Sequence, residues 1–304
     1  MKVAIIGAGA MGSLFGALLA DAGNDVWLLS TWQEHLAAIS DKGLKINYKD
    51  HTRTIYLNTA TRLEEIGPSD LTLIFVKSYH TETVAGTAAA LAGAEGVIMT
   101  LQNGLGNAEK LAACIDPERI IAGTTSHGAT VLEPGHIRHA GMGATVIGSW
   151  NGNNKPVIDE IAAAFCRSGI ETQVVDNVRP VIWEKLLVNV GINAITALTG
   201  MRNGQLLDMA VTRELVRKTV EEAITIAIAK GIKVREDMVE HVFKVAKATA
   251  ANRSSMGQDV DRGRFTEIGA INGMIVSAGK RLSIPTPINE TLVALVETLQ
   301  GHYT

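Results

Sequence analysis

A glycine-rich turn near the start of the chain constrains the fold more than any other feature. The apolar run Lys2–Ile6 has the composition of a buried parallel strand, and the glycines of Gly7–Gly12 follow it at G-x-G-x-x-G spacing. A helix over Ser13–Ala20 and a second strand over Asp25–Leu29 give this motif the strand–turn–helix setting of a dinucleotide-binding unit. The free N–H groups at such a helix start suit phosphate. The turn residues expected to bind the cofactor are Gly7, Gly9, Ala10, Met11 and Gly12.

The same stretch also resembles a secretory signal, because Lys2 precedes apolar residues up to Ala20. Three glycines at fingerprint spacing interrupt the apolar run, and no A-x-A cleavage site follows it, so we discount a secretory signal.

The two cysteines suggest no special chemistry. Cys114 and Cys166 match no metal or redox spacing, so we expect no metal site and no disulfide framework. A reducing, cytoplasmic setting is the simplest expectation.

Length and charge restrict the remaining classes. A chain of 304 residues is long enough for two domains, and a net charge of −3 gives no electrostatic case for nucleic acid or an anionic membrane. We expect no apolar run long enough to span a bilayer, since the best candidate, Leu186–Leu198, is interrupted by Asn189 and Asn193. We therefore expect neither a nucleic-acid partner nor a membrane partner.

The first part of the chain, residues 1–176, alternates short apolar strands with helical segments. This alternation predicts an α/β domain with a Rossmann-type, doubly wound parallel sheet, which binds ligands at the carboxyl ends of its strands. A hairpin between Ile137–His139 and the strand Val146–Gly148, turning through residues 141–143, is a further expectation. The other expected strands are Leu71–Val76, Gly96–Leu101 and Arg119–Ala122.

The second part, residues 177–304, shows only helical patterns and predicts an all-α domain. Its helices permit a homodimer but equally suit a single core. The cleft between the two domains is the default place for a substrate. The first expected helix begins at Arg179-Pro180. The others cover Thr212–Lys230, Asp237–Ala251, Thr266–Lys280 and Asn289–Gln300.

Polar residues follow three of the expected strands. Lys77, Asn103 and the run Thr124–His127 each come just past a strand, on the side of the sheet where ligands bind. Any one of them could be an ordinary loop residue, but three together favour function. His127 is a second candidate proton donor, and both it and His139 could equally be satisfied loop residues.

One helix face carries the pattern Lys185, Asn189 and Asn193, spaced by four residues among Leu, Val and Ile. A surface helix would show more charge, and an unpaired ammonium in a core would be costly. A helix that lines a polar cleft resolves both objections, and an inter-domain hydrogen-bond network is the alternative.

A third group of polar residues follows in the helical part. Ser254 and Ser255 are expected at a helix end or turn, where hydroxyl and N–H groups can bind a carboxylate. Glu267, taken alone, fits a solvated acid in the first turn of a helix.

These motifs together resemble the ketopantoate reductase (2-dehydropantoate 2-reductase) family over essentially the whole chain. The helical Lys185/Asn189/Asn193 pattern and the Ser254-Ser255-Met256 segment are the most discriminating. The other matching stretches are Gly7–Gly12, Lys77, Gln102-Asn103-Gly104, Gly123-Thr124-Thr125 and Thr266-Glu267-Ile268.

The resemblance implies reduction of ketopantoate to pantoate with NADPH, a step of pantothenate and coenzyme A synthesis. It implies that Lys185 is the general acid and that Glu267 orients the substrate hydroxyl or Lys185, and it also places Glu267 by the cofactor. It further implies substrate contacts for Asn103, Asn189, Asn193 and Ser255. It also places Asn103 and Lys77 beside the nicotinamide and its ribose. A cationic donor suits this chemistry, because hydride addition builds negative charge on the carbonyl oxygen.

The segment after the second strand departs from the family pattern. Ser30 and Thr31 stand where many members place a basic residue for the 2′-phosphate of NADP. No Asp or Glu ends the second strand, as NAD selectivity usually requires. The Ser30 and Thr31 hydroxyls can donate to a phosphate and Trp32 could stack on adenine, so NADPH is favoured over NADH. Two alternatives stay open: a reductase of another small 2-oxo or β-hydroxy acid, and a non-catalytic NADP-sensing protein.

Overall fold

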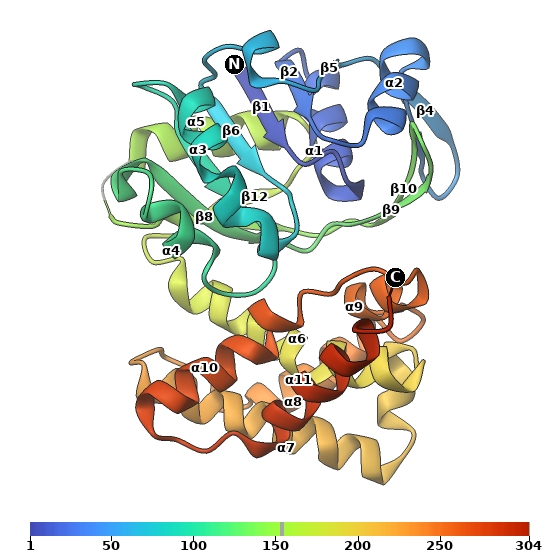
Figure 1. Ribbon diagram of the computed structural model, residues 1–304, viewed down its shortest axis with the longest axis vertical. Coiled ribbons are helices and arrows are strands. Elements are labelled where there is room, and N and C mark those ends of the chain that lie inside the picture. Colours follow the sequence, from blue (N-terminus) through green and yellow to red (C-terminus); the bar gives the residue numbers. More distant parts are fainter. Residues whose placement is uncertain (153–154, 304) are drawn as a thin grey trace. The chain divides into compact units, whose positions relative to one another are not determined.

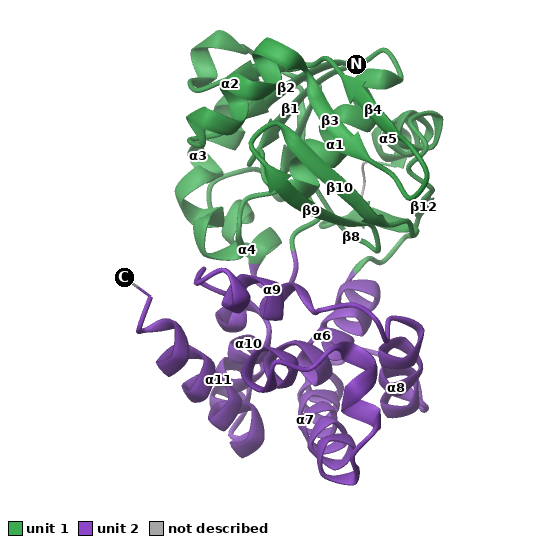
Figure 2. Ribbon diagram, turned by 90° about the vertical axis from the view of Figure 1, so that its right-hand side faces the viewer, with its two compact units in different colours: residues 1–102, 107–178 green, residues 103–106, 179–304 purple. Residues whose placement is uncertain are grey.

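The computed structural model describes residues 1–152 and 155–303, so Thr304, the end of the expected second domain, lies outside the described residues. The chain forms two compact units (Figure 2). Unit 1 contains residues 1–102 and 107–178, and unit 2 contains residues 103–106 and 179–304. The segment 103–106 is therefore part of the helical unit, although it follows a strand of unit 1.

Unit 1 is built on an eight-stranded sheet with helices on both faces (Figure 1), which confirms the expected α/β class. The strands pair in parallel except that β11 runs antiparallel to β8. In sheet order they are β12 (Thr172–Val174), β11 (Thr145–Ser149), β8 (Ile120–Thr125), β7 (Val97–Thr100), β6 (Leu71–Ile74), β1 (Lys2–Ile6), β2 (Asp25–Leu29) and β5 (Asn58–Ala60). The helices are α1 (Ala10–Asp21), α2 (Gln33–Lys42), α3 (Thr81–Ala92), α4 (Asn107–Ala112) and α5 (Lys155–Arg167).

The core of unit 1 explains why β1 and α1 form where they do. Every residue from Val3 to Ile6 is buried, as expected for a central strand covered on both faces. Phe15 of α1 is fully buried and contacts the rings of Phe75 and Phe165 at centroid distances of 5.0 and 6.0 Å. These contacts fix the glycine-rich turn between two well-packed elements.

A second sheet of four strands contradicts the expected hairpin. β10 (His136–Gly141) pairs antiparallel with β9 (Gly128–Glu133) and parallel with β3 (Leu44–Asn47), whose other neighbour is β4 (Thr52–Ile55). The prediction that Ile137–His139 pairs with Val146–Gly148 was therefore wrong. The cause is the Pro134-Gly135 turn, in which Gly135 has φ +74° and Glu133 pairs with His136. A Pro-Gly pair with a positive φ at glycine is a strong turn signal, and it closes the hairpin before residue 141 is reached.

β8 is also longer than expected. Thr124 and Thr125 belong to the strand rather than to the loop beyond it, because they pair with Val146 and Thr145 of β11. The Thr145 hydroxyl donates to Thr125 Oγ1 at 2.9 Å. Of the expected loop residues, only Ser126 and His127 follow the strand directly.

Every regular element of the described part of unit 2 is helical. Its α-helices are α6 (Arg179–Thr199), α7 (Ala210–Ala229), α8 (Met238–Ala248), α9 (Ser255–Asp261), α10 (Asn272–Leu282) and α11 (Pro287–Gln300). The expected helix Thr266–Lys280 is interrupted: a short 3-10 turn covers Ile268–Ala270, and α10 begins only at Asn272. The buried Asn272 amide donates to Asn289 Oδ1 at 3.0 Å and to Val190 O at 3.3 Å, so this helix start is tied to two other helices.

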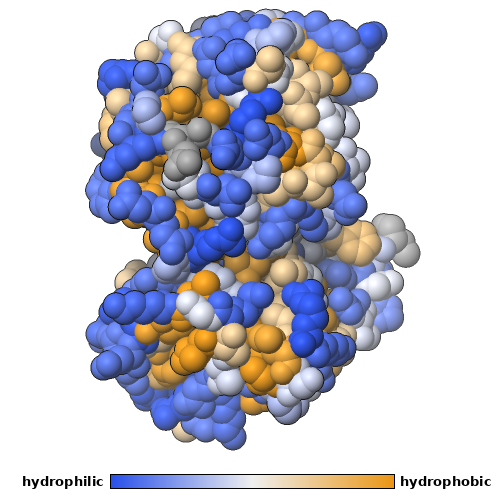
Figure 3. All heavy atoms as spheres, turned by 90° about the vertical axis from the view of Figure 1, so that its left-hand side faces the viewer, coloured by the Kyte–Doolittle hydropathy of each residue, from blue (hydrophilic) through white to orange (hydrophobic). Residues whose placement is uncertain are grey.

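α6 is long and apolar enough to cross a membrane by length and composition alone, which the sequence argument had not allowed. Within the unit, 61% of its most apolar window is buried. Burial of this extent is typical of a central helix in a domain core. Exposed apolar side chains occur on both units, among them Tyr56, Met142, Val211 and Ile228, and the face in Figure 3 shows apolar groups interspersed with polar ones.

Close packing around α6 gives a stability prediction. A Cβ atom on Gly191 would lie 2.6 Å from Val220 Cγ2 and 3.0 Å from Val242 Cγ1. Gly191→Ala should therefore destabilise unit 2 by about 1–3 kcal/mol through overpacking, partly offset by better helix propensity. Gly86→Ala is the matched control, because that exposed position of α3 has open space for a Cβ in the described structure and should gain up to about 1 kcal/mol. Thermal unfolding of both variants tests this, and a Gly191→Ala protein as stable as the parent would contradict it.

Candidate functional site

The predicted cofactor residues of unit 1 gather at one edge of the large sheet. Ile6, the last residue of β1, pairs with Leu29 at the end of β2 and with Ile74 at the end of β6. Gly7, Ser30 and Lys77 follow these three neighbouring strands. The carboxyl edge of the parallel sheet therefore brings together residues from three distant parts of the sequence, as the doubly wound plan requires.

The three fingerprint glycines differ in what a side chain at each position would meet. Gly7 has φ +105°, and a Cβ there would lie 2.6 Å from Val76 N, so the turn itself requires glycine. A Cβ on Gly12 would lie 2.0 Å from Gly7 O, so the helix can approach the turn only without a side chain. Gly9 is exposed, has φ −74°, and meets no atom of residues 1–152 or 155–303 within 4 Å of its Cβ position. Protein packing gives no reason for glycine at position 9, whereas a closely approaching ligand would.

The start of α1 also suits an anion. Gly9 occupies its N-cap, and in the described structure no side chain caps it and no acidic residue lies in its first turn. Ala10, Met11 and Gly12 form that first turn, so their N–H groups have no preceding helical turn to bind. The residues present therefore fit the pyrophosphate of a dinucleotide.

Two residues of the segment after β2, Ser30 and Trp32, already contact other residues of the same segment. Ser30 Oγ accepts the Trp32 N–H at 3.1 Å, and the Thr31 residue is exposed. The Trp32 indole stacks on the His35 ring at a centroid distance of 4.4 Å and an angle of 15°, so one of its faces is already covered. Only the other face could meet an adenine. Sequence reasoning missed His35, although its i, i+3 spacing from Trp32 at the start of α2 is a local signal for this contact.

In unit 2 the structure places Lys185, Asn189 and Asn193 along α6, as the spacing predicts. Asn193 is buried, whereas Lys185 and Asn189 are partly buried. Burial lowers the pKa of Lys185 to about 8, and the nearby Glu267 carboxylate opposes that shift. The lysine is therefore a better proton donor than an exposed one while still carrying charge near neutral pH.

Glu267 comes from a different part of unit 2 and is 8% exposed, so it is not the solvated acid that it resembles in sequence. The Asn103 amide donates to Glu267 Oε2 at 3.4 Å. Asn103 is held nearby because Leu105 N donates to Ala270 O at 2.9 Å, and a Cβ on Gly104 would lie 2.3 Å from that same oxygen. Unit 2 thus brings Asn103, Lys185 and Glu267 into one group.

Asn193 carries a signal of its own. Its Nδ2 is buried and has no hydrogen-bond partner among the described residues. A buried amide donor without a partner costs about 1–3 kcal/mol, which a ligand oxygen would recover. This orphaned donor on the Lys185 face is the feature expected of a polar binding site.

The two serines of the 254–255 pair differ in role. Ser254 caps α9, since its Oγ accepts Gly257 N–H at 2.9 Å and the Thr196 hydroxyl at 2.7 Å. Ser255 is exposed in the first turn of α9. The structure therefore leaves Ser255 as the serine that can meet a ligand, and its part in binding stays a prediction.

The histidine pair of unit 1 makes a poorer proton donor. His127 Nδ1 and His139 Nε2 lie 3.1 Å apart, with the rings stacked at a centroid distance of 5.3 Å. Burial lowers the pKa of both imidazoles, and for His127 the nearby His139 adds to the effect. Both are therefore neutral near pH 7, which favours Lys185 over His127 as the acid.

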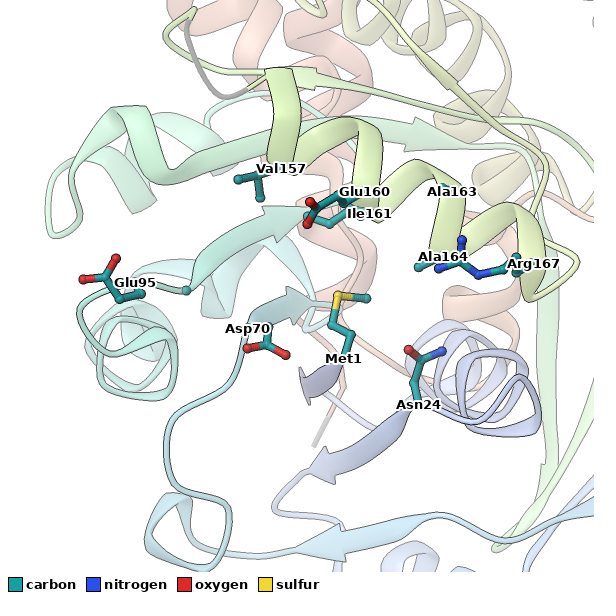
Figure 4. Close-up of a pocket in the computed structure, with 11 residues that line it drawn as sticks. Met1, Asn24, Asp70, Glu95, Val157, Glu160, Ile161, Ala163, Ala164 and Arg167 are labelled. Atoms are coloured by element: carbon teal, nitrogen blue, oxygen red, sulfur yellow. The ribbon is translucent and has the colours of Figure 1, made fainter.

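One cavity of unit 1 lies at the opposite edge of the sheet from the fingerprint (Figure 4). Met1, Asp70 and Gly96 line it and directly precede β1, β6 and β7, so the cavity faces the amino ends of the strands. Glu95 and Glu160 add negative charge to that of Asp70, which outweighs the positive charge of Arg167 in the same lining. Its place and its carboxylates make it unsuitable for a dinucleotide phosphate.

Unit 1 is a Rossmann-type unit with the dinucleotide fingerprint, and unit 2 holds a lysine of lowered pKa beside a buried carboxylate. Together these features define the class of two-domain dinucleotide-dependent proteins. Family models described as "Ketopantoate reductase PanE/ApbA" and "Ketopantoate reductase PanE/ApbA C terminal" match residues 3–152 and 177–300. The chain belongs to the ketopantoate reductase family, as its motifs had indicated.

Full-length relatives and solved structures agree with this membership. The 2-dehydropantoate 2-reductase of Halobacterium salinarum is 39% identical over 301 residues, covering 99% of both chains. That of Pyrococcus horikoshii is 35% identical, covering 99% of this chain and 98% of its own. The crystal structure of a PanE/ApbA family ketopantoate reductase from Ralstonia eutropha has a TM-score of 0.92 at 32% identity, covering 99% of each chain. D-mandelate dehydrogenase with NADH and anilino(oxo)acetate also has a TM-score of 0.92, at 27% identity, covering 99% of this chain and 98% of its own.

Proposed function

We propose that this protein reduces ketopantoate to pantoate with NADPH and so serves pantothenate and coenzyme A synthesis. The observation that carries the proposal is a group of side chains in unit 2. Lys185 of α6 has a lowered pKa, the buried Glu267 carboxylate lies near it, and Asn193 of the same helix has an amide donor without a partner among the described residues. Membership of the ketopantoate reductase family supports the choice of substrate.

Lys185 has the properties of a general acid for this reaction. A reduced nicotinamide, when bound, supplies a hydride to C2 of a 2-oxo acid, and negative charge then grows on the carbonyl oxygen. The Lys185 ammonium stabilises that charge and transfers its proton to the oxygen. Glu267 keeps the lysine protonated near neutral pH, because its negative charge opposes the effect of burial on the lysine pKa.

The other side chains of unit 2 hold the substrate in place. The Asn193 Nδ2 group donates to a hydroxyl or carbonyl oxygen, which satisfies an otherwise unpaired buried donor. Asn189 contributes from one turn earlier on α6, and Ser255 receives the carboxylate at the start of α9. Asn103 holds the Glu267 carboxylate through its amide.

Unit 1 supplies the cofactor contacts. The first turn of α1 receives the pyrophosphate, Ser30 and Thr31 meet the 2′-end of the adenosine ribose, and Lys77 follows β6 at the same sheet edge. Ser30 retains a hydroxyl hydrogen to donate, because it acts only as an acceptor toward Trp32 N–H. Hydroxyl donors in place of a basic residue support NADPH binding while leaving NADH possible.

A second candidate function comes from the likeness to D-mandelate dehydrogenase, a protein whose structure was determined with NADH and anilino(oxo)acetate. On this alternative the Lys185 chemistry is unchanged, but the substrate is another 2-oxo acid and the cofactor is NADH. The absence of a basic residue in the segment 29–35 is the observation that favours it.

The deciding experiment follows the oxidation of NADPH and of NADH by the purified protein, first with ketopantoate and then with a panel of 2-oxo acids. Fast turnover with ketopantoate and NADPH is the expected result. Activity only with another acid or with NADH would favour the second candidate. Binding of cofactor with no turnover on any acid would indicate a non-catalytic sensor and overturn both.

The lowered pKa of Lys185 predicts a pH profile. The reductive reaction needs the protonated lysine, so kcat/KM should be constant at neutral pH and fall as pH rises through about 8, well below the 10.5 of an ordinary lysine. Glu267→Gln removes the charge that raises the lysine pKa, so the fall should move to lower pH. Steady-state rates across the alkaline range measure both profiles, and an identical profile in parent and variant would contradict the coupling.

A further inference from the structure

His35 of α2 is fully buried, and both of its ring nitrogens have partners. The Gly135 N–H donates to His35 Nδ1 at 3.1 Å, so that nitrogen is an acceptor and the hydrogen resides on Nε2. His35 Nε2 lies 3.0 Å from Ser13 Oγ and therefore donates to it. Burial lowers the pKa of His35 to about 4, so the imidazole is neutral at physiological pH.

Ser13 links His35 to the glycine-rich turn through two hydrogen bonds of its hydroxyl group. It is fully buried and directly follows Gly12 in α1. Because its oxygen accepts from His35, its hydroxyl hydrogen is directed to Ala8 O at 3.3 Å. Ala8 lies between Gly7 and Gly9, so a hydrogen-bonded chain runs from α2 to the centre of the fingerprint.

The same imidazole supports the segment after β2. Its ring lies flat against the Trp32 indole, at a centroid distance of 4.4 Å. The backbone N–H of Trp32 in turn donates to the Oγ of Ser30, the first residue after the strand. The His35 side chain is therefore linked to the pyrophosphate turn through Ser13, and it contacts Trp32 in the segment expected to meet the adenosine ribose.

The Pro134-Gly135 turn is the third segment that contacts His35. Gly135 approaches α2 so closely that a Cβ on it would lie 2.8 Å from Ala38 Cβ. Its carbonyl oxygen accepts Lys45 N–H of β3 at 2.9 Å, so the small sheet fixes the turn that orients His35. The histidine is thus locked in one tautomer and one orientation by the Pro134-Gly135 turn.

We propose that His35 is a positioning residue of the dinucleotide site, which sets the fingerprint turn through Ser13 and the adenosine-side segment through Trp32. The proposal rests on the proposed function, because it requires that unit 1 bind a nicotinamide dinucleotide. His35 touches no cofactor atom itself. Its effect is on how tightly the adenosine–pyrophosphate half of the cofactor is held, and the chemical step is unaffected.

The test is a double-variant cycle on cofactor affinity. His35→Asn keeps an acceptor for Gly135 and loses the donor to Ser13, while Ser13→Ala removes the other end of that hydrogen bond. Each should raise the dissociation constant of NADPH and its KM by about fivefold, with kcat within about twofold of the parent. The double variant should be no weaker than His35→Asn alone, because both changes break the same chain. 2′,5′-ADP, used as a competitive inhibitor, should lose affinity by the same factor.

His51→Asn is the matched control, since His51 is an exposed histidine of unit 1 and should bind NADPH as the parent does. Should His35→Asn fail to fold, Ser13→Ala still decides the question. Parent-like affinity in Ser13→Ala, or effects that multiply in the double variant, would overturn the positioning role alone. A parent protein that binds neither NADPH nor NADH would overturn the proposed function together with it.

Discussion

Lys185→Ala is expected to lower kcat for ketopantoate reduction by about 10²–10⁴-fold, the usual contribution of a general acid. The variant loses the only proposed proton donor to the carbonyl oxygen, and the Glu267 carboxylate then adds unfavourable negative charge near the growing alkoxide. Substrate-dependent NADPH oxidation measures the rate. NADPH binding should persist, because the fingerprint lies in unit 1.

The control for this variant is Lys218→Ala, which removes an exposed lysine of α7 in the same unit and should leave kcat unchanged. Lys185→Met tests whether loss of the long side chain alone explains the effect, since methionine retains much of the lysine stem. A rate within a few-fold of the parent for Lys185→Ala would show that the lysine is not the general acid.

Gly9→Ala should weaken NADPH binding by about tenfold or more while leaving the fold intact. The Cβ would extend into open space in the described structure, and the backbone at φ −74° and ψ −171° accepts alanine without strain. Less freedom in the unfolded chain should even stabilise the protein by about 0.4–1 kcal/mol. A pyrophosphate that approaches this backbone would meet the new methyl group. Fluorescence titration with NADPH, paired with thermal unfolding, separates the two effects.

Gly12→Ala is the contrasting variant, because its Cβ would lie 2.0 Å from Gly7 O and must displace the helix or the turn. It should lose stability and binding together. If Gly9→Ala bound NADPH as tightly as the parent, the pyrophosphate would not lie against this turn.

The sequence was sufficient for the class of fold, because its strongest signals are local. β1 and α1 are adjacent elements with clear apolar patterns, and the fingerprint glycines stand between them. The second sheet was missed although the Pro134-Gly135 turn was visible, because the partner of β10 on its other side, β3, lies about ninety residues away in the chain. Pairing at such distance depends on tertiary packing, which no local pattern records.

The candidate site divides in the same way. The face of Lys185, Asn189 and Asn193 could be predicted, because helix periodicity alone places them together. The burial of Glu267 and its contact with Asn103 could not be predicted from spacing, since 164 positions separate the two residues. The His35–Ser13 contact was likewise hidden, because it joins two different helices, and the Gly135 N–H that orients His35 comes from a turn a hundred residues further on.

Residues 103–106 are part of unit 2, and this limits how the two units can be exchanged between related proteins. The chain passes from one unit to the other after residues 102, 106 and 178, so no single crossover separates them. A chimera that exchanged only residues 179–304 would take Lys185 and Glu267 from one parent and Asn103 from the other. Gly104 would then have to fit a foreign residue 270 at a distance that tolerates no side chain. Inheritance of the helical unit as a working module therefore requires the four-residue loop to travel with it.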